Sequence, residues 1–269
     1  MRSRTQITGM QLLDEFVSHG VNQFTSAEAA ARLGRSAAAT GNILGRLVRD
    51  GLLDRVRRGH YAIRQLGTLG TTAAAESVLL SVAAGFRDVP HRVAYRTALD
   101  QLDLLAHPSR SIQVALAKPT RSERLSGRRL TVVQEPESAL DVGAKKQDGV
   151  LISDLERSLL DAAARPDLVG GIAVLAEALG AASSKGVDAE KLTEYARALS
   201  WGPALRRIGS LADRLHIAGL AGRLAPLTKP SSDIDLEPGH GHGQTSYRDA
   251  KWWVRWDQAP SELQNVVHQ

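Results

Sequence analysis

Hydrophobic and polar positions near the start of the chain follow a helical spacing three times and then alternate twice. Apolar residues recur at helical spacing over residues 8–19, 26–33 and 37–50. Residues 53–57 and 60–64 alternate between apolar and polar side chains, with a two-residue turn between them. Three short helices followed by a hairpin predict a winged helix-turn-helix, which places a helix in the major groove of DNA and the hairpin, or wing, on phosphates.

Capping residues mark where the helices of this segment begin and end. Thr25 or Ser26 begins the second helix, and Glu28 lies close to the capping-box position. Gly34 makes the turn that follows, and Ser36 is the expected N-cap of the third helix. A tight turn therefore joins the second helix to the third, as a helix-turn-helix requires.

The third predicted helix has an outer face of small and basic residues. Gly41 and Gly45 each weaken a helix by about 1 kcal/mol relative to Ala, and a merely solvated face gives no reason to carry both. Small residues let the helix axis approach a surface closely, which favours entry into a groove over a solvated surface. The candidates for DNA contact on this helix are Arg35, Ser36, Ala37, Ala38, Gly41, Asn42, Gly45, Arg46 and Arg49.

Side-chain chemistry separates these candidates into base readers and phosphate contacts. The amide of Asn42 can bond bidentately to adenine, and the guanidinium of Arg46 can reach guanine or a phosphate. Arg35 and Arg49 are expected to contact phosphates. We therefore expect sequence recognition to depend most on Asn42.

Arginines also dominate the predicted wing. Arg55, Arg57, Arg58 and Arg64 are expected to project from the hairpin toward the DNA backbone or the minor groove. His60 is either a phosphate donor or a histidine packed against the wing. A winged helix that binds another protein is the alternative to DNA binding.

The charge of the protein is concentrated in this same segment. Residues 1–66 contain ten arginines, no lysine and five acidic residues, whereas the other 203 residues contain 24 basic and 24 acidic ones. The formal net charge of +5 therefore lies entirely in residues 1–66. Positive charge confined to a helix-turn-helix pattern is typical of a protein that binds a polyanion, so double-stranded DNA is the expected partner.

A second, larger domain is predicted over residues 73–269, after a DNA-binding domain at 1–66 and a linker at 67–72. The pattern predicts an α+β fold: an N-terminal winged helix-turn-helix, then a larger mixed α/β domain with a small sheet and several helices. The predicted helices are 73–84, 93–105, 155–164, 172–179, 188–199 and 204–215, and the predicted strands are 111–117, 129–134 and 150–154.

The end of the chain is predicted to return to the sheet. A loop at 227–245 contains prolines and a run of Gly and His, and a flexible tail is expected after residue 257. Between them, residues 247–256 are expected to form a last strand that completes the sheet of the domain. Alternation separates two faces of that strand, one with Trp252, Val254 and Trp256 and the other with Trp253 and Arg255.

Composition narrows the cellular and chemical possibilities. The absence of cysteine excludes disulfides, thiolate metal sites and cysteine nucleophiles. No apolar run resembles a signal peptide, and none reaches the ~18–20 residues of a membrane span. A cytoplasmic protein without membrane contact is therefore expected.

Enzymatic sites find little support in the pattern. Asp233 and Asp235 resemble the carboxylate pair of a nucleotidyl transferase, but a helix and a Pro-rich loop separate them from the only Gly-Ser upstream. His240 and His242 lie in a glycine loop without a third metal ligand nearby. We expect no enzymatic activity, no cofactor and no metal.

Residues 152–172, ISDLERSLLDAAARPDLVGGI, resemble the stretch SDxERTLLDxxxRPxxxGG of the AbiEi-type antitoxins. These are the antitoxin partners in abortive-infection (type IV) toxin-antitoxin pairs. The resemblance extends over nearly the whole chain, through the winged helix, the helix at 95–98, the VALA strand and the tryptophan-bearing last strand. The chain differs from typical members at Leu104-Leu105, where they carry Gly-Leu, and in a polar extension of the tail.

The resemblance implies a protein with two roles. The winged helix would repress its own operon by binding inverted-repeat DNA in its promoter, and the C-terminal domain would counteract a cognate nucleotidyltransferase-like toxin. The motif residues that the resemblance singles out are Asp154, Glu156, Arg157, Asp161, Gly170 and Gly171. For the four charged ones, a helix N-cap and helix-surface ion pairs are the favoured explanation, since Arg157 and Asp161 have i,i+4 spacing and can satisfy each other.

Two other functions are compatible with the sequence. The first is a ligand-responsive winged-helix repressor whose C-terminal domain binds an effector. The second is an enzyme fused to a winged helix, for which the sequence offers no site.

Overall fold

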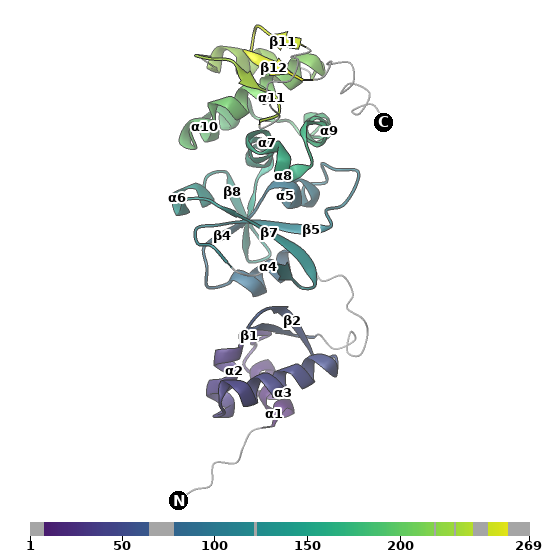
Figure 1. The fold of residues 1–269 in the computed structure, drawn as a ribbon, viewed down its shortest axis with the longest axis vertical. Coiled ribbons are helices and arrows are strands. Elements are labelled where there is room, and N and C mark those ends of the chain that lie inside the picture. The colour runs from purple at the N-terminus through teal and green to yellow at the C-terminus, as the bar shows by residue number, and fades with distance from the viewer. Residues whose placement is uncertain are drawn as a thin grey trace, which may run out of the picture. The chain divides into compact units, whose positions relative to one another are not determined.

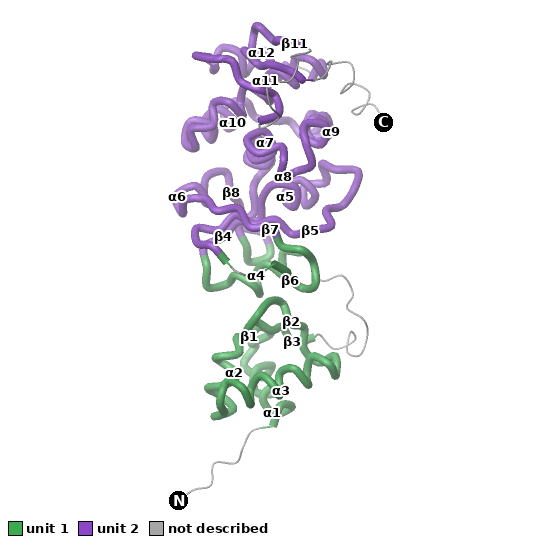
Figure 2. Tube along the Cα trace, in the orientation of Figure 1, with its two compact units in different colours: residues 1–89, 120–130, 148–150 green, residues 90–119, 131–147, 151–269 purple. Residues whose placement is uncertain are grey.

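The fold is described by a computed structural model that covers residues 8–64, 78–120, 123–217, 219–228, 230–238 and 247–257 (Figure 1). The expected linker at 67–72, the expected tail after 257, and His240 and His242 lie outside the described residues. The chain divides into two compact units (Figure 2). Unit 1 comprises residues 1–89, 120–130 and 148–150, and unit 2 comprises residues 90–119, 131–147 and 151–269.

Unit 1 begins with a winged helix-turn-helix, as the sequence predicts. Its helices are α1 (Gly9–Ser18), α2 (Ser26–Leu33) and α3 (Ala37–Arg49). Its strands are β1 (Gln23–Thr25), β2 (Leu53–Arg57) and β3 (His60–Ile63), which form an antiparallel sheet in the order β1-β3-β2. The hairpin of β2 and β3 is the wing, and β2 is its outer edge strand.

The predicted caps explain where these helices start. Thr25 and Glu28 form a complete capping box at α2, and Gly34 ends that helix in the left-handed conformation. The hydroxyl of Ser36 accepts a hydrogen bond from the backbone of Ala39 and caps α3. Each cap satisfies backbone N–H groups that have no partner inside the helix.

An aromatic stack holds the winged helix together. The rings of Phe16 and Phe24 stack with centroids 4.4 Å apart, and Phe24 stacks on Tyr61 at 6.0 Å. Leu12 and Leu44 are fully buried beside them. Met10 and Val17 of α1, which the helical pattern would place in this core, are each 52% exposed instead.

Unit 1 also contains α4 (Val78–Phe86), β6 (Arg124–Leu125) and the first residues of β7 (Arg128–Gln134). The helix α4 overlaps the predicted helix 73–84, of which residues 73–77 lie outside the described part of the chain. The β6–β7 turn lies against the wing, because the backbone N–H of Ser126 donates to the carbonyl of Val56 at 2.7 Å. The winged helix thus shares its unit with segments distant in sequence.

Six strands form one sheet in the order β6-β7-β5-β4-β9-β8. The central strand β4 (His91–Val93) pairs antiparallel with β5 (Ser111–Leu116) and parallel with β9 (Val150–Ser153). Sequence periodicity predicts a helix over 93–105, but the chain is a strand at Val93 and the helix α5 (Tyr95–Gln101) starts later. Tertiary pairing outweighs the helical pattern there, since Val93 is fully buried between Val114 and Ile152.

Helices make up most of the rest of unit 2. Helix α7 (Leu155–Ala164) packs against α11 (Gly202–Arg214). The fully buried leucines and isoleucine of these two helices belong to the hydrophobic core of unit 2. None of the described helices is long and apolar enough to cross a membrane. The other elements are α6 (Glu137–Leu140), β8 (Ala144–Gln147), α8 (Pro166–Val169), α9 (Ile172–Ser183), α10 (Ala189–Ala198), α12 (Leu220–Leu224) and the 3₁₀ helix η1 (Ala225–Leu227).

The last strand expected at 247–256 is two short strands, β11 (Tyr247–Asp249) and β12 (Val254–Trp256). The carboxylate of Asp249 accepts hydrogen bonds from the backbone of Lys251 and Trp252, and this turn reverses the chain. With β10 (Ile234–Asp235), which lies in the expected loop, they form a separate three-stranded sheet instead of completing the six-stranded one. Trp252, Val254 and Trp256 are fully buried, as their predicted shared face requires.

Candidate nucleic-acid interface

Helix α3 presents to solvent the face that the sequence predicts. Thr40, Leu44 and Leu47 are buried and fix the helix on the core of the winged helix. Arg35 precedes the helix and is half-buried. The exposed predicted residues are Ser36, Ala37, Ala38, Gly41, Asn42, Gly45, Arg46 and Arg49.

Three polar side chains on this face have no partner in the part of the chain that the structure describes. Among the described residues, none makes a side-chain hydrogen bond or ion pair with Asn42, Arg46 or Arg49. Their donors and acceptors are therefore directed to solvent and available to a ligand. The combination of an amide and two guanidinium groups suits base edges and phosphates.

Gly41 and Gly45 leave this face open. A Cβ atom built on either glycine meets no described heavy atom within 4 Å. Nothing in the packing of the winged helix therefore requires glycine at these positions, although each costs about 1 kcal/mol of helix stability. The lack of a side chain at Gly41 and Gly45 therefore affects only a ligand that approaches α3 from solvent.

The arginines of the wing divide into two groups. Arg55 and Arg58 are exposed, and no described residue forms a hydrogen bond or ion pair with their side chains. Arg57, by contrast, turns inward: its Nε donates to the carbonyl of Gly85 and its guanidinium lies 5.3 Å from the ring centroid of Phe86. Burial lowers the pKa of Arg57, although it stays positively charged at neutral pH. The expectation that Arg57 projects toward DNA is therefore corrected.

Arg64 and His60 also have roles inside the protein. The guanidinium of Arg64 binds both carboxylate oxygens of Asp54 across the hairpin at 2.8 to 3.0 Å, and this hydrogen bonding raises its pKa. Its side chain is 15% exposed, so the expected projection from the wing is corrected here too. Burial and the charge of Arg57 lower the pKa of His60, which makes it a neutral, half-buried wing residue.

Arg87 provides a contact that sequence reasoning missed. It follows α4 and binds the carboxylate of Glu28 at 2.5 Å and the backbone carbonyl of Gln23 at 3.1 Å. Arg57 and Arg87 thus both link the winged helix to the C-terminal end of α4. The sequence contains no local signal for the contact between Arg87 and Glu28, because these two residues lie 59 positions apart.

The antitoxin-like motif in unit 2 forms a buried ring of charges. Arg157 and Asp161, the predicted i,i+4 pair, bind each other at 2.7 Å. Arg92 binds Asp161 at 2.6 Å and Glu135 at 2.8 Å, and Arg157 closes the ring on Glu135 at 2.8 Å. All four side chains are between 0% and 6% exposed, so the expectation of helix-surface ion pairs is wrong for this pair.

The remaining motif residues are also structural. Asp154 caps α7 as expected and accepts a second hydrogen bond from the hydroxyl of Tyr195. Glu156 is buried and accepts the backbone N–H of Asp188. Gly170 and Gly171 have φ values of +109° and +96° between α8 and α9, a conformation that favours glycine. The motif therefore holds α7 to its neighbours.

The candidate catalytic carboxylates are engaged in ion pairs. Asp233 binds Arg248 and Asp235 binds Arg255, each at 2.8 Å. No group of three or more histidine and carboxylate side chains that could hold a metal ion occurs within the described ranges. His240 and His242 lie outside those ranges.

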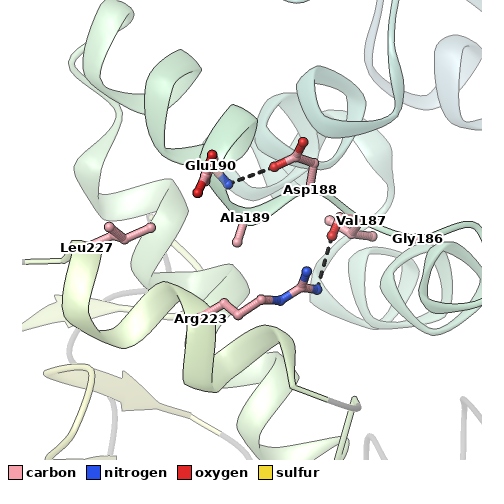
Figure 3. A pocket seen from close by; sticks show the side chains of 7 residues that line it. All are labelled: Gly186, Val187, Asp188, Ala189, Glu190, Arg223 and Leu227. Atoms are coloured by element: carbon pink, nitrogen blue, oxygen red, sulfur yellow. Dashed lines mark hydrogen bonds between the residues drawn. The ribbon is translucent and has the colours of Figure 1, made fainter.

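An open depression in unit 2 tests the idea of an effector site (Figure 3). It is lined by Gly186, Val187, Asp188, Ala189, Glu190, Arg223 and Leu227 and measures about 570 Å³. Arg223 donates to the carbonyl of Val187, and the backbone of Glu190 donates to the carboxylate of Asp188, so two of its charged side chains, Arg223 and Asp188, already have partners. Small-molecule sites are typically enclosed, whereas this depression is open to solvent and three of its seven lining residues are charged.

Comparison with known proteins bears on the winged helix and on the fold. Residues 10–64 match the family model described as "Transcriptional regulator, AbiEi antitoxin", which confirms the resemblance over the winged helix and supports a regulatory role. The fold is similar to the crystal structure of the RV2827C protein from Mycobacterium tuberculosis, with a TM-score of 0.68 and 18% identity over 97% of this chain and 94% of that chain. No curated protein matches the chain.

Proposed function

We propose that this protein is a transcriptional repressor that binds duplex DNA through α3 and the wing, and that it is also the antitoxin of a type IV toxin-antitoxin pair. The exposed face of α3 carries the first half of the proposal. There Asn42, Arg46 and Arg49 have no partner among the described residues, and two glycines leave room for a close approach. Inverted-repeat DNA in its own promoter is the proposed target.

The family match and the motif support the second half of the proposal. The matched family joins transcriptional regulation to antitoxin function in its description. The motif at 152–172 resembles the same antitoxins, and its Arg157 and Asp161 form a buried ion pair in unit 2. The proposed partner of unit 2 is a nucleotidyltransferase-like toxin encoded beside this protein.

DNA binding is tested with the promoter fragment upstream of the gene, measured by fluorescence anisotropy. Asn42→Ala and Arg46→Ala should each weaken binding by about 5-fold or more, since a bidentate base contact contributes about 1–3 kcal/mol. Arg110→Ala, which removes an exposed arginine of unit 2, is the matched control and should bind like the wild type. Equal affinities for all four proteins would exclude α3 as the reading helix.

Toxin counteraction is tested by co-expressing the full chain with the product of the adjacent gene. The wild type should restore growth, and the Asn42→Ala/Arg46→Ala variant should restore it equally when both genes are under a foreign promoter. Such a result would separate antitoxin action from repression. Failure of the wild type to restore growth would refute the antitoxin half and leave the repressor half to the DNA experiment.

A further inference from the structure

The outer edge of the wing is covered by a second basic hairpin. In the sheet order β1-β3-β2, strand β2 has one free edge, and an edge strand offers unpaired backbone groups. The turn of the β6–β7 hairpin occupies that edge, where Ser126 donates to the carbonyl of Val56 at 2.7 Å. The hairpin is therefore attached directly to the strand that carries Arg55.

Close packing under the hairpin fixes it in this position. Leu125 is fully buried and lies against Gly85 of α4. A Cβ atom on Gly85 would be 2.5 Å from the side chain of Leu125 and 3.7 Å from that of Val56, so helix, hairpin and wing meet with no space for a methyl group. The three elements form one block within unit 1.

The hairpin holds two arginines in an unfavourable arrangement. Arg124 and Arg129 are directly opposite each other in the β6–β7 ladder, and both are exposed. Like charges at directly opposed positions destabilise a sheet. The guanidinium of Arg124 donates to the carbonyl of Gly127, and among the described residues neither arginine forms an ion pair with a carboxylate. An anionic ligand would relieve the repulsion that the described residues leave uncompensated.

We propose that the β6–β7 hairpin is a second phosphate-binding element, in which Arg124 and Arg129 contact the backbone of the same duplex that the wing contacts. The inference rests on the proposed DNA-binding function. Because Arg57 turns inward, the wing keeps Arg55 and Arg58 as its exposed cations, and the hairpin adds two more on the edge of β2. Guanidinium groups suit phosphate oxygens, and such contacts are independent of base sequence.

The test measures how the affinity of the full chain for duplex DNA depends on salt. Because phosphate contacts do not need an operator, the probe is a labelled duplex of about 40 base pairs of arbitrary sequence. The plot of log K against log salt has a negative slope. Replacing both arginines, Arg124→Gln/Arg129→Gln, should reduce the magnitude of that slope by about 1.8, or about 0.9 for each lost contact. Arg110→Gln/Arg197→Gln removes the same charge from exposed positions in unit 2 and should keep the wild-type slope.

A second variant separates lost contacts from lost folding. Arg129→Glu places a carboxylate opposite Arg124, which should raise the thermal stability of the hairpin while weakening DNA binding more than Arg129→Gln does. A hairpin variant with the slope of the unit 2 control would overturn the proposal. If the hairpin variant keeps the control slope while the wing variant Arg55→Gln/Arg58→Gln has a less steep one, DNA binding by the wing stands and only the hairpin is excluded. If the wild type does not bind the duplex, both fail.

Discussion

At the scale of single residues, arginines with similar positions in the sequence have different surroundings. Arg57 and Arg58 are neighbours in the wing, yet Arg57 binds Gly85 and Phe86 while Arg58 is exposed at the turn. A bulge in the ladder between Arg55 and Arg57 shifts the register of β2 there. The alternation of the sequence does not reveal which side chain turns toward α4.

We expect Arg57→Gln and Arg58→Gln to affect different properties. Arg57→Gln should lower the free energy of unfolding by about 1–2 kcal/mol, because a charged hydrogen bond and a cation–π contact are lost, and should leave the salt slope of DNA binding unchanged. Arg58→Gln should leave the free energy of unfolding unchanged and reduce the magnitude of the salt slope of DNA binding by about 0.9. Thermal unfolding and anisotropy titrations measure the two effects. A slope reduced equally by both variants would contradict the inward position of Arg57.

The buried ring makes the stability of unit 2 sensitive to charge. Burial alone would raise the pKa of Asp161, but the charges of Arg92 and Arg157 outweigh it and hold the pKa below its ordinary value. A carboxylate with a lowered pKa stabilises the fold above the ordinary aspartate pKa of about 3.9, and this contribution is lost as the pH falls below that value.

Asp161→Asn should therefore lower the free energy of unfolding by about 3–5 kcal/mol at neutral pH, since it leaves two buried guanidinium groups with only the single charge of Glu135 between them. It should also remove part of the acid sensitivity of the wild type. The control is Asp167→Asn, which breaks the half-exposed pair with Arg165 and should cost about 1 kcal/mol or less. Urea unfolding at pH 7 and at a pH below about 3, where the contribution of the carboxylate is being lost, measures both. Equal losses for the two variants would argue against the ring as a stabilising element.

At the scale of elements, local signals predict where the capped helices begin. Thr25 with Glu28, Ser36 and Asp154 cap the helices that the sequence predicts, because a cap depends on residues within one turn. Short strands were harder to predict. The strand β4 has three residues and exists through its pairing with β5 and β9, so its own pattern merged with that of the following helix.

The glycines of α3 allow stability and binding to be separated. Gly41→Ala/Gly45→Ala should stabilise the winged helix, by up to about 1 kcal/mol for each site, because alanine favours the helix and no described atom lies within 4 Å of the new methyl groups. The same variant should weaken DNA binding, since both methyl groups would stand on the face that enters the groove. Thermal unfolding and anisotropy measure the two effects.

Gly222→Ala in α12 is the matched control for the α3 glycines. This glycine also has open space around its Cβ position, but it lies in unit 2. The substitution should leave DNA affinity unchanged. If the α3 variant binds DNA as tightly as the wild type, the glycines are not needed for a close approach.

At the scale of the whole molecule, the two units have separate hydrophobic clusters. Phe16, Phe24 and Leu44 belong to the cluster of the winged helix, whereas the large cluster of unit 2 includes Leu159 and Trp256. All four tryptophans of the chain, at positions 201, 252, 253 and 256, lie in unit 2. Tryptophan fluorescence therefore reports on unit 2, while far-ultraviolet circular dichroism reports on both units.

We expect the units to differ in their response to a core substitution. Phe16→Ala should destabilise the winged helix by about 3–5 kcal/mol. The variant should shift part of the circular dichroism transition to lower urea and leave the tryptophan fluorescence transition in place. A fluorescence transition that moves by the same amount would show that the two units unfold together.

The sequence by itself determined the winged helix, the caps of its helices and the concentration of positive charge in residues 1–66, because these depend on neighbouring residues and on composition. It also indicated the i,i+4 pair of Arg157 and Asp161. Only the tertiary structure decided that this pair is buried in a ring with Arg92 and Glu135, and that Arg57 is held against α4 while Arg58 is exposed. The physical reason is that burial and pairing depend on which distant segments pack together, and no local pattern encodes that.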